Sequence, residues 1–170
     1  MLQVSQRAHY GLRAMTELAK SYGQRTVSLT EIAGVEHVPA GYLEQLAIPL
    51  RRAGLIEGTR GAHGGYQLAK PPGDLTVGAV VRALEGPVAP VECLLLEYVP
   101  GSCTREPVCL SRSVWQRVKE SVDSVLDSIT LADLCTSPSD DAVPAFVPLA
   151  FVPIEDVRPV QAADPCSIAG

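Results

Sequence analysis

Three of the five cysteines lie close together in the sequence: Cys93, Cys103 and Cys109. Thiolates bind metal ions or react with oxidants, and protonated thiols pack in apolar cores. The spacing of the cysteines alone leaves these roles open. Pro100 and Pro107 fall between them, so we expect a loop with little structure of its own over residues 85–109.

A second group of chemically useful residues lies in the glycine-rich segment 58–65, which contains Arg60 and His63. The segment is too flexible for a core element, so we expect it to project into solvent as the tip of a β-hairpin. The chain has no nucleophile–base pair and no phosphate-binding loop of the kinds that mark enzymes. We therefore do not expect an enzyme.

The elements that position these groups begin with three predicted helices, over about residues 6–22, 28–35 and 39–53. Gly23 is suited to end the first helix. Ser28 and Glu31 predict a capping box at the start of the second. Pro39 suits the first position of the third helix, and Gly54 its end.

The third helix is expected to bury Leu43, Leu46 and Leu50 against the core. Pro49 lies within it and is expected to kink or loosen its last turn. Two short apolar runs then flank the glycine-rich segment and predict the strands of the hairpin. Thr76 is expected to cap a fourth helix, which ends near residue 84.

Helix, helix–turn–helix and hairpin is the order of a winged-helix DNA-binding domain, which we place over residues 1–84 of a mainly α fold. The net charge of −5 opposes nucleic-acid binding only if it is taken as a whole. Residues 1–75 carry a net charge of +2, and residues 76–170 a net charge of −7. A nucleic-acid binder needs a basic face rather than a basic whole.

A long helix is predicted over residues 110–135. Apolar residues follow one another there at intervals of three and four, as in a coiled-coil seam: Trp115, Val118, Val122, Val125 and Ile129. One small domain does not need so long a seam, so we expect this helix to hold a homodimer together. The alternative is a helix that packs wholly on its own domain.

Residues 136–170 are rich in proline and acidic side chains and show no period, so we expect a disordered tail. The sequence starts without an apolar leader segment. No apolar run reaches the roughly 18 residues of a membrane span. We therefore expect a cytoplasmic protein without a membrane partner or a small-molecule substrate.

Several motifs together closely resemble the IscR/NsrR/CymR-type family of bacterial regulators. They are YGLRAM at 10–15, YLEQL at 42–46, LRRAGLI at 50–56, GGYQL at 64–68 and SITLADL at 128–134. The resemblance covers about residues 1–135. It implies a homodimeric winged-helix regulator, most simply a repressor, that binds imperfect palindromes in double-stranded DNA. In many members three cysteines hold an iron–sulphur cluster.

The resemblance assigns DNA contacts to five positions: Gly41, Tyr42, Glu44 and Gln45 in the third helix, and Arg60 in the hairpin. By their own chemistry, Arg51 and Arg52 are expected to contact phosphates or solvent, and His63 a phosphate. The chemistry agrees, since glutamine pairs with adenine and glutamate accepts a hydrogen bond from cytosine N4. For Tyr42, simple packing is an equally good interpretation.

The resemblance also places an iron–sulphur cluster on Cys93, Cys103 and Cys109, as a 2Fe–2S rather than a 4Fe–4S cluster. Two departures from the family pattern stand out. Nine residues separate the first two cysteines, where the best-known members have five. Arg112 stands where the IscR type has a ligating histidine, and a guanidinium cannot ligate a metal.

A fourth ligand must therefore come from elsewhere. His9 of the partner subunit is the leading candidate, because NsrR-type members use a carboxylate at the matching position. Glu92, Glu97 and Glu106 are alternatives that lie closer in sequence. His9 equally suits a half-exposed helix residue or a phosphate contact. Cys135 lies outside the motif and is expected to pack.

The sequence thus predicts a transcription regulator whose operator binding changes with a cluster that senses iron–sulphur supply, nitric oxide or redox state. Two alternatives stay open. One is a regulator of the same fold without a cluster, controlled by a thiol switch, a zinc site or a protein partner. The other is an interaction protein that does not bind DNA.

Overall fold

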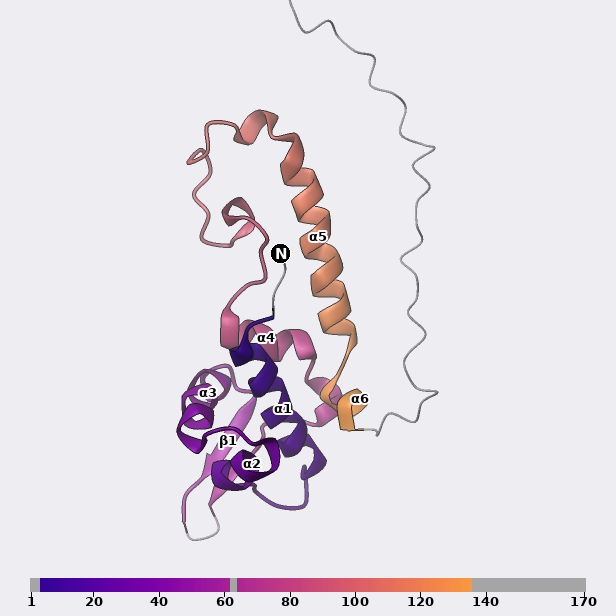
Figure 1. Ribbon diagram of the computed structural model, residues 1–170. Coiled ribbons are helices and arrows are strands. Elements are labelled where there is room, and N and C mark those ends of the chain that lie inside the picture. Colours follow the sequence, from indigo (N-terminus) through magenta and orange to yellow (C-terminus); the bar gives the residue numbers. More distant parts are fainter. Residues whose placement is uncertain (1–3, 62–63, 136–170) are drawn as a thin grey trace, which may run out of the picture. The chain divides into compact units, whose positions relative to one another are not determined.

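Helices α1 (Gln6–Lys20), α2 (Leu29–Glu36) and α3 (Ala40–Arg52) follow one another in the predicted order. The computed structural model describes residues 4–61 and 64–135. The remaining elements are β1 (Ile56–Thr59), β2 (Gly65–Leu68), α4 (Val77–Glu85), α5 (Leu110–Ser128) and α6 (Leu131–Cys135). Figure 1 shows this mainly helical arrangement with its single hairpin, which confirms the expected fold class. The predicted tail at 136–170 lies outside the described residues.

Hydroxyl groups begin the helices where the sequence predicts them. The Ser28 hydroxyl accepts a hydrogen bond from the Glu31 backbone N–H at 3.1 Å, and Thr76 caps α4 in the same way through Ala79. The reciprocal half of the predicted capping box is absent, because the Glu31 carboxylate binds the guanidinium of Arg25 instead. The capping box at α2 is therefore only half formed.

Helix α3 runs through Pro49 to Arg52, so the proline does not end it. The helix then closes as predicted at Gly54, whose φ of 68° is unfavourable for other residues. The Gly54 N–H binds the Arg51 carbonyl at 3.0 Å, and the Leu55 N–H binds the Leu50 carbonyl at 3.0 Å. These two bonds are the Schellman pattern of a helix end.

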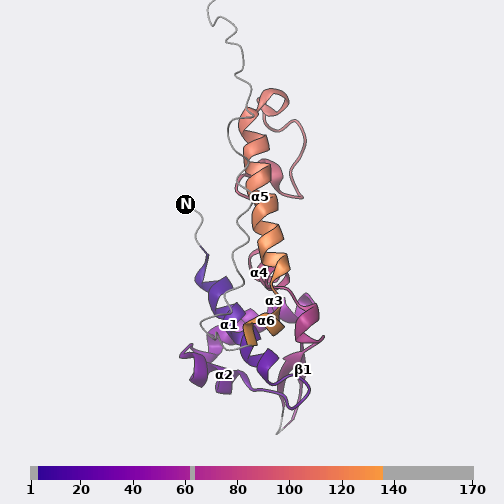
Figure 2. The same ribbon diagram turned by 90° about the vertical axis from the view of Figure 1, so that its right-hand side faces the viewer.

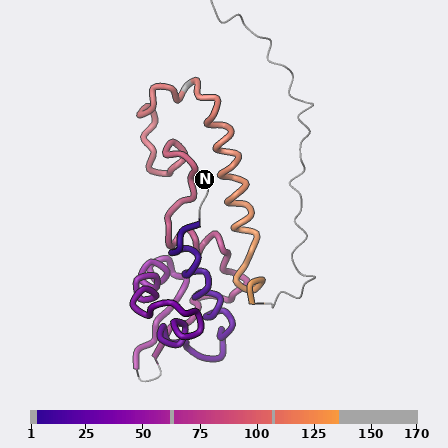
Figure 3. Tube along the Cα trace, in the orientation of Figure 1, coloured from indigo at the N-terminus to yellow at the C-terminus, as the bar shows by residue number. Residues whose placement is uncertain are grey.

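The hairpin is antiparallel and pairs Ile56 with Leu68 at its base and Thr59 with Gly65 near its tip. Val27, just before α2, adds a bridge to Tyr66 on the outer edge of β2. The hairpin is thus tied to the helix–turn–helix as well as to α3. Figure 3 follows the chain through this region.

The core lies where α1, α3 and α4 meet. Its fully buried side chains come from five of the helices: Met15, Ile32, Leu43, Leu46, Val80 and Leu131. Leu131, in α6, is 0% exposed, so the chain beyond α5 returns to the winged-helix core. Cys135 is half-buried there beside α1, with its Sγ 3.9 Å from the Thr16 carbonyl oxygen. Cys135 packs as expected.

Helix α5 contacts α4 but buries none of its own residues. It is the longest helix in Figure 2. Ile129 has an extended backbone and separates α5 from α6, so the predicted single helix over 110–135 is two helices. The described residues place only one side of α5 on its own domain, and its role in a homodimer stays a prediction. None of the helices described there is both long enough and apolar enough to cross a membrane.

Candidate nucleic-acid interface and cysteine loop

Helix α3 turns one face to solvent, because its leucines occupy the other. Leu43, Leu46 and Leu50 are at most 3% exposed. Five of the residues that we expect to contact DNA lie exposed on this helix: Gly41, Glu44, Gln45, Arg51 and Arg52. The structure therefore brings these predicted residues onto one accessible helix.

Ile48 belongs to the same face, although the sequence analysis did not single it out. It follows Glu44 by four residues and Gln45 by three, the spacing that places side chains on one side of a helix. Its side chain is 53% exposed and is not part of the core. An aliphatic group there can contact the C5 methyl of thymine. The helical spacing was the signal that could have found it.

Tyr42 differs from its neighbours, because it is half-buried and packs against the core. Its ring meets the ring of Tyr10 edge to face, with 6.1 Å between centroids. The Arg13 guanidinium lies 5.7 Å from the Tyr10 ring and also binds Glu36 of α2. Tyr42 thus has a packing role that joins α3 to α1.

The wing presents Arg60, which is exposed directly after β1. The base of the wing approaches the backbone of Val27 so closely that only glycine fits at position 65. A Cβ at Gly65 would lie 2.7 Å from the Val27 carbonyl oxygen. His63 lies outside the described residues, so its predicted contact stays a prediction.

The surface between α3 and the hairpin is hollowed and basic. Ile48, Arg51 and Tyr66 line one hollow there. Arg51 also borders a second hollow with Lys70 and Glu57. Lys70 follows β2 by two residues and was missed in the sequence analysis, where a lone lysine gives no periodic signal. Cationic side chains beside a solvent-facing helix suit contacts with phosphates.

The cysteine loop does not gather its thiols. Cys93 is half-buried in the 3-10 turn η2 (Glu92–Leu94), Cys103 is exposed, and Cys109 caps α5. Within the described residues, no three His, Cys, Asp or Glu side chains lie close enough together to hold one metal ion. In a single chain, these donors do not fit a cluster as they are arranged.

Cys109 nevertheless lies among groups that favour its ionised form. Its Sγ lies 3.3 Å from the Ser111 hydroxyl. That contact lowers the pKa of Cys109, with help from backbone N–H groups at the start of α5 and from the charge of Arg105. Cys135 is the opposite case, because burial raises its pKa. Of these two thiols, Cys109 is the one suited to ligation or oxidation.

Glu106 organises the loop that the sequence predicts to be unstructured. Its carboxylate accepts hydrogen bonds from the Gly101 N–H at 2.8 Å and from the Tyr98 hydroxyl at 3.1 Å. The Arg112 guanidinium lies 3.6 Å away on the other oxygen. These contacts lower the pKa of Glu106, and the hydrogen bond from the Gly101 N–H has the largest effect. Arg112 thus supports the loop through a carboxylate, at the position where the IscR type has a ligand.

His9 is exposed on α1, with its ring 5.4 Å from that of Tyr10. It is not grouped with the cysteines in this chain, so its proposed role toward a partner's cluster is untested.

The match to known proteins covers the whole described part of the chain. A family model, Rrf2, described as an iron-dependent transcriptional regulator, matches residues 4–137. The chain belongs to the Rrf2 family of transcription regulators. Among its relatives, the HTH-type regulator CymR of Bacillus subtilis is 44% identical over 135 residues, 79% of this chain and 91% of CymR. IscR of Aliivibrio salmonicida is 32% identical over 133 residues, 78% of this chain and 77% of IscR.

Solved structures of Rrf2-type regulators show the same fold. The structure of CymR, titled the global cysteine regulator of B. subtilis, has a TM-score of 0.64 at 44% identity and covers 79% of this chain and 97% of its own. The structure of T. potens IscR has a TM-score of 0.62 at 43% identity, and the match covers 78% of this chain and 85% of the IscR chain. These comparisons confirm the family resemblance, the winged-helix fold and a DNA-binding regulator rather than an enzyme.

Proposed function

We propose that two copies of this Rrf2 regulator bind an imperfect palindrome in double-stranded DNA and repress transcription. The main support is that Glu44, Gln45 and Ile48 are exposed together on α3, next to the basic hollow that Arg51 lines. In this arrangement α3 enters the major groove, where its side chains meet base edges, and Arg60 of the wing follows the backbone.

The second copy is held by α5. Four large apolar side chains of this helix are exposed in the single chain: Leu110 88%, Val114 57%, Trp115 41% and Val125 51%. A contiguous apolar face of this kind marks a protein contact. A symmetric dimer also matches a palindrome, because each α3 meets one half-site.

Selection of bound sequences from random double-stranded DNA tests the proposal. We expect an enriched palindrome, and a Gln45→Ala variant that loses preference at one base pair per half-site. Gln6→Ala, at an exposed position on α1, is the matched control and should select the wild-type sequence. Binding without any sequence preference would contradict the proposal and favour an interaction protein.

We propose further that the cysteine loop is where a signal changes DNA binding, through a 2Fe–2S cluster on Cys93, Cys103 and Cys109. The iron-dependent family and the lowered pKa of Cys109 support this proposal. The loop must rearrange to bring the thiols together. Control by the thiols themselves is the second candidate, because the described thiols do not form a metal site in this chain and a thiolate reacts with oxidants without one.

Anaerobic purification separates these candidates. Iron and sulphide in equal amounts, lost in Cys109→Ser but kept in Cys135→Ser, would support the cluster. A metal-free protein whose DNA affinity still changes on oxidation would support the thiol switch. Loss of the metal in His9→Ala would support its role as the fourth ligand, and unchanged cluster absorption would exclude it.

A further inference from the structure

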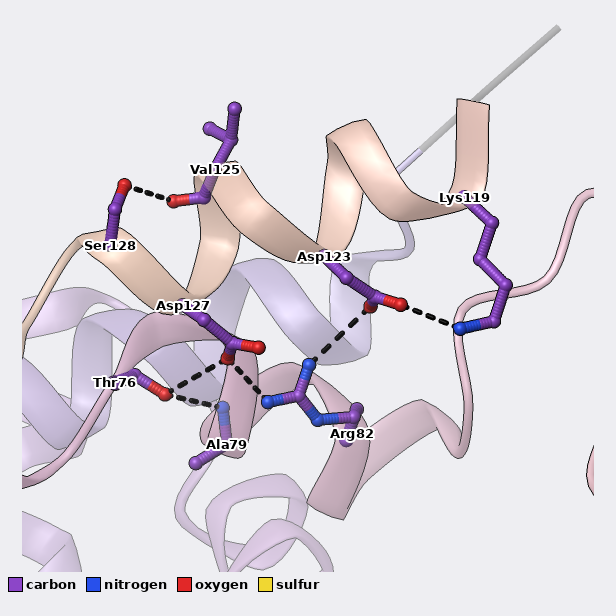
Figure 4. Close-up of polar contacts among 8 residues, drawn as sticks. All are labelled: Thr76, Ala79, Arg82, Lys119, Asp123, Val125, Asp127 and Ser128. Carbon is purple, nitrogen blue, oxygen red and sulfur yellow. Dashed lines mark hydrogen bonds and ion pairs between the residues drawn. The ribbon is translucent and has the colours of Figure 1, made fainter. Parts of the chain in front are cut away.

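A group of charged side chains joins α4 to α5, as Figure 4 shows. Arg82 of α4 binds the carboxylates of Asp127 and Asp123, which lie one turn apart on α5; the distance to Asp123 is 3.4 Å. Lys119 binds the other oxygen of Asp123 at 2.6 Å. The Thr76 hydroxyl, which caps α4, lies 3.3 Å from Asp127. We call Arg82, Asp123 and Asp127 the α4–α5 clamp.

The backbone fixes only the end of α5 that lies next to the clamp. The Val77 N–H binds the Ile129 carbonyl at 2.8 Å, and the Leu131 N–H binds the Leu75 carbonyl at 2.9 Å. These bonds form a pivot directly after α5, and Leu131 is buried beyond it. A pivot of two hydrogen bonds holds the end of the helix in place but does not set the direction of its other end.

Apolar packing of α5 on α4 is incomplete. No residue of α5 is buried. Hollows lie on both sides of the clamp, one of about 400 Å³ bordered by Val81, Val122 and Leu126, and one of about 280 Å³ bordered by Leu94 and Leu96. The clamp therefore supplies side-chain hydrogen bonds between α4 and α5 where their apolar packing is incomplete.

The fit at the clamp is close. A Cβ at Gly78 would lie 2.1 Å from Oδ1 of Asp127 and 2.9 Å from a terminal nitrogen of Arg82. Glycine at this position lets the carboxylate approach the first turn of α4. The hydrogen bond from Arg82 lowers the pKa of Asp127, so the pair stays ionised near neutral pH.

We propose that the α4–α5 clamp sets the spacing of the two DNA half-sites, by fixing the dimer helix at one angle to the winged-helix domain. The inference rests on the proposed dimeric DNA binding, and it names the residues that determine the distance between the two half-sites. Arg82 and Asp127 are positioning residues, since they need not touch DNA.

The geometry gives the size of the effect. A helix of 19 residues is about 28 Å long at 1.5 Å per residue. A change of about 10° at the pivot moves its far end by about 5 Å, more than the 3.4 Å rise of one base pair. Loss of the clamp therefore suffices to reduce the difference in affinity between operators whose half-site spacings differ by one base pair.

The test uses the full chain and the palindrome that the wild type selects, with one base pair inserted or removed at its centre. Wild type should lose about tenfold or more in affinity on either change, because each half-site then falls out of register. The affinity of Arg82→Gln should fall less than about threefold on the same insertion or removal. This variant should bind an isolated half-site with the affinity of wild type. Gly78→Ala displaces the clamp without changing charge and should behave like Arg82→Gln. Arg117→Gln, the same substitution at an exposed position of α5, should keep the wild-type ratio.

Light scattering and thermal unfolding accompany each affinity measurement. If Arg82→Gln does not fold, Asp127→Asn takes its place with the same expected ratio. A folded, dimeric variant that keeps the wild-type ratio between spacings, or that loses affinity equally for all DNAs, overturns the inference. A wild type that binds no sequence, or that is monomeric, overturns the proposed function itself, so the two failures are distinct.

Discussion

Replacing Gly65 with alanine should displace the wing and weaken both folding and DNA binding. The added methyl group would lie 2.7 Å from the Val27 carbonyl oxygen and 2.8 Å from its carbon. Both are backbone atoms, so no side chain can turn aside, and β2 must move away from the segment before α2. Arg60 moves with it, because β1 pairs with β2.

The expected loss of stability follows from two contributions. Overpacking of a close contact costs about 1–3 kcal/mol. Val27 and Tyr66 also exchange two backbone hydrogen bonds of 2.9 and 2.8 Å, which the displacement weakens. At up to about 1 kcal/mol for each bond, the free energy of unfolding should fall by about 1–5 kcal/mol. That corresponds to a fall in Tm of about 10 °C for a domain of this size.

Thermal unfolding at a fixed protein concentration measures this change, since a dimer's Tm depends on concentration. Gly73→Ala is the matched control, because a Cβ at Gly73 meets nothing within 4 Å and its φ is not positive. The control should stay within about 0.5 kcal/mol of wild type. If both variants have the same Tm, the close approach at Gly65 does not determine the position of the wing.

Three further predictions concern single side chains. Ile48→Ala should weaken operator binding about fourfold, which corresponds to the loss of one buried methyl contact of about 0.8 kcal/mol. Replacing the contacted thymine with uracil should weaken binding by wild type but not by Ile48→Ala, and anisotropy titrations measure both affinities. Iodoacetamide should label Cys109 before Cys135 in peptide mass spectra, since the pKa of Cys109 is lowered and that of Cys135 is raised; equal rates would refute this. The lowered pKa of Asp127 stabilises the fold above the ordinary aspartate pKa, and this contribution is lost as the pH falls through the lower, folded value. Wild-type stability should therefore fall more steeply than that of Asp127→Asn below about pH 4, and parallel curves would show that the clamp adds no stability.

The sequence predicts those features that local chemistry determines. Ser28 and Thr76 start their helices through their hydroxyl groups, and Gly54 ends α3 because it adopts a positive φ. Helical spacing also identified the buried leucines of α3. Helix α3 continues past Pro49 to Arg52, because packing of its leucine face on the core outweighs one missing backbone hydrogen bond, and the kink expected at Pro49 stays a prediction.

Features that depend on distant contacts could not be predicted. Glu106 organises the cysteine loop through Tyr98, Gly101 and Arg112, none of which shares a periodic pattern with it. Arg82 meets its carboxylates more than 40 positions later in the chain. The family resemblance pointed to the cysteines and to the exposed residues of α3, but it could not place the thiols relative to one another.

In the proposed function, the side chains of α3 determine which operator sequence a symmetric dimer binds. The most direct measurement compares the sequences that wild type and Glu44→Ala select from the same random DNA pool. We predict a palindrome for both, with the preference at one base pair relaxed symmetrically in each half-site of the variant. Identical selected sequences, or no palindrome for wild type, would contradict the account.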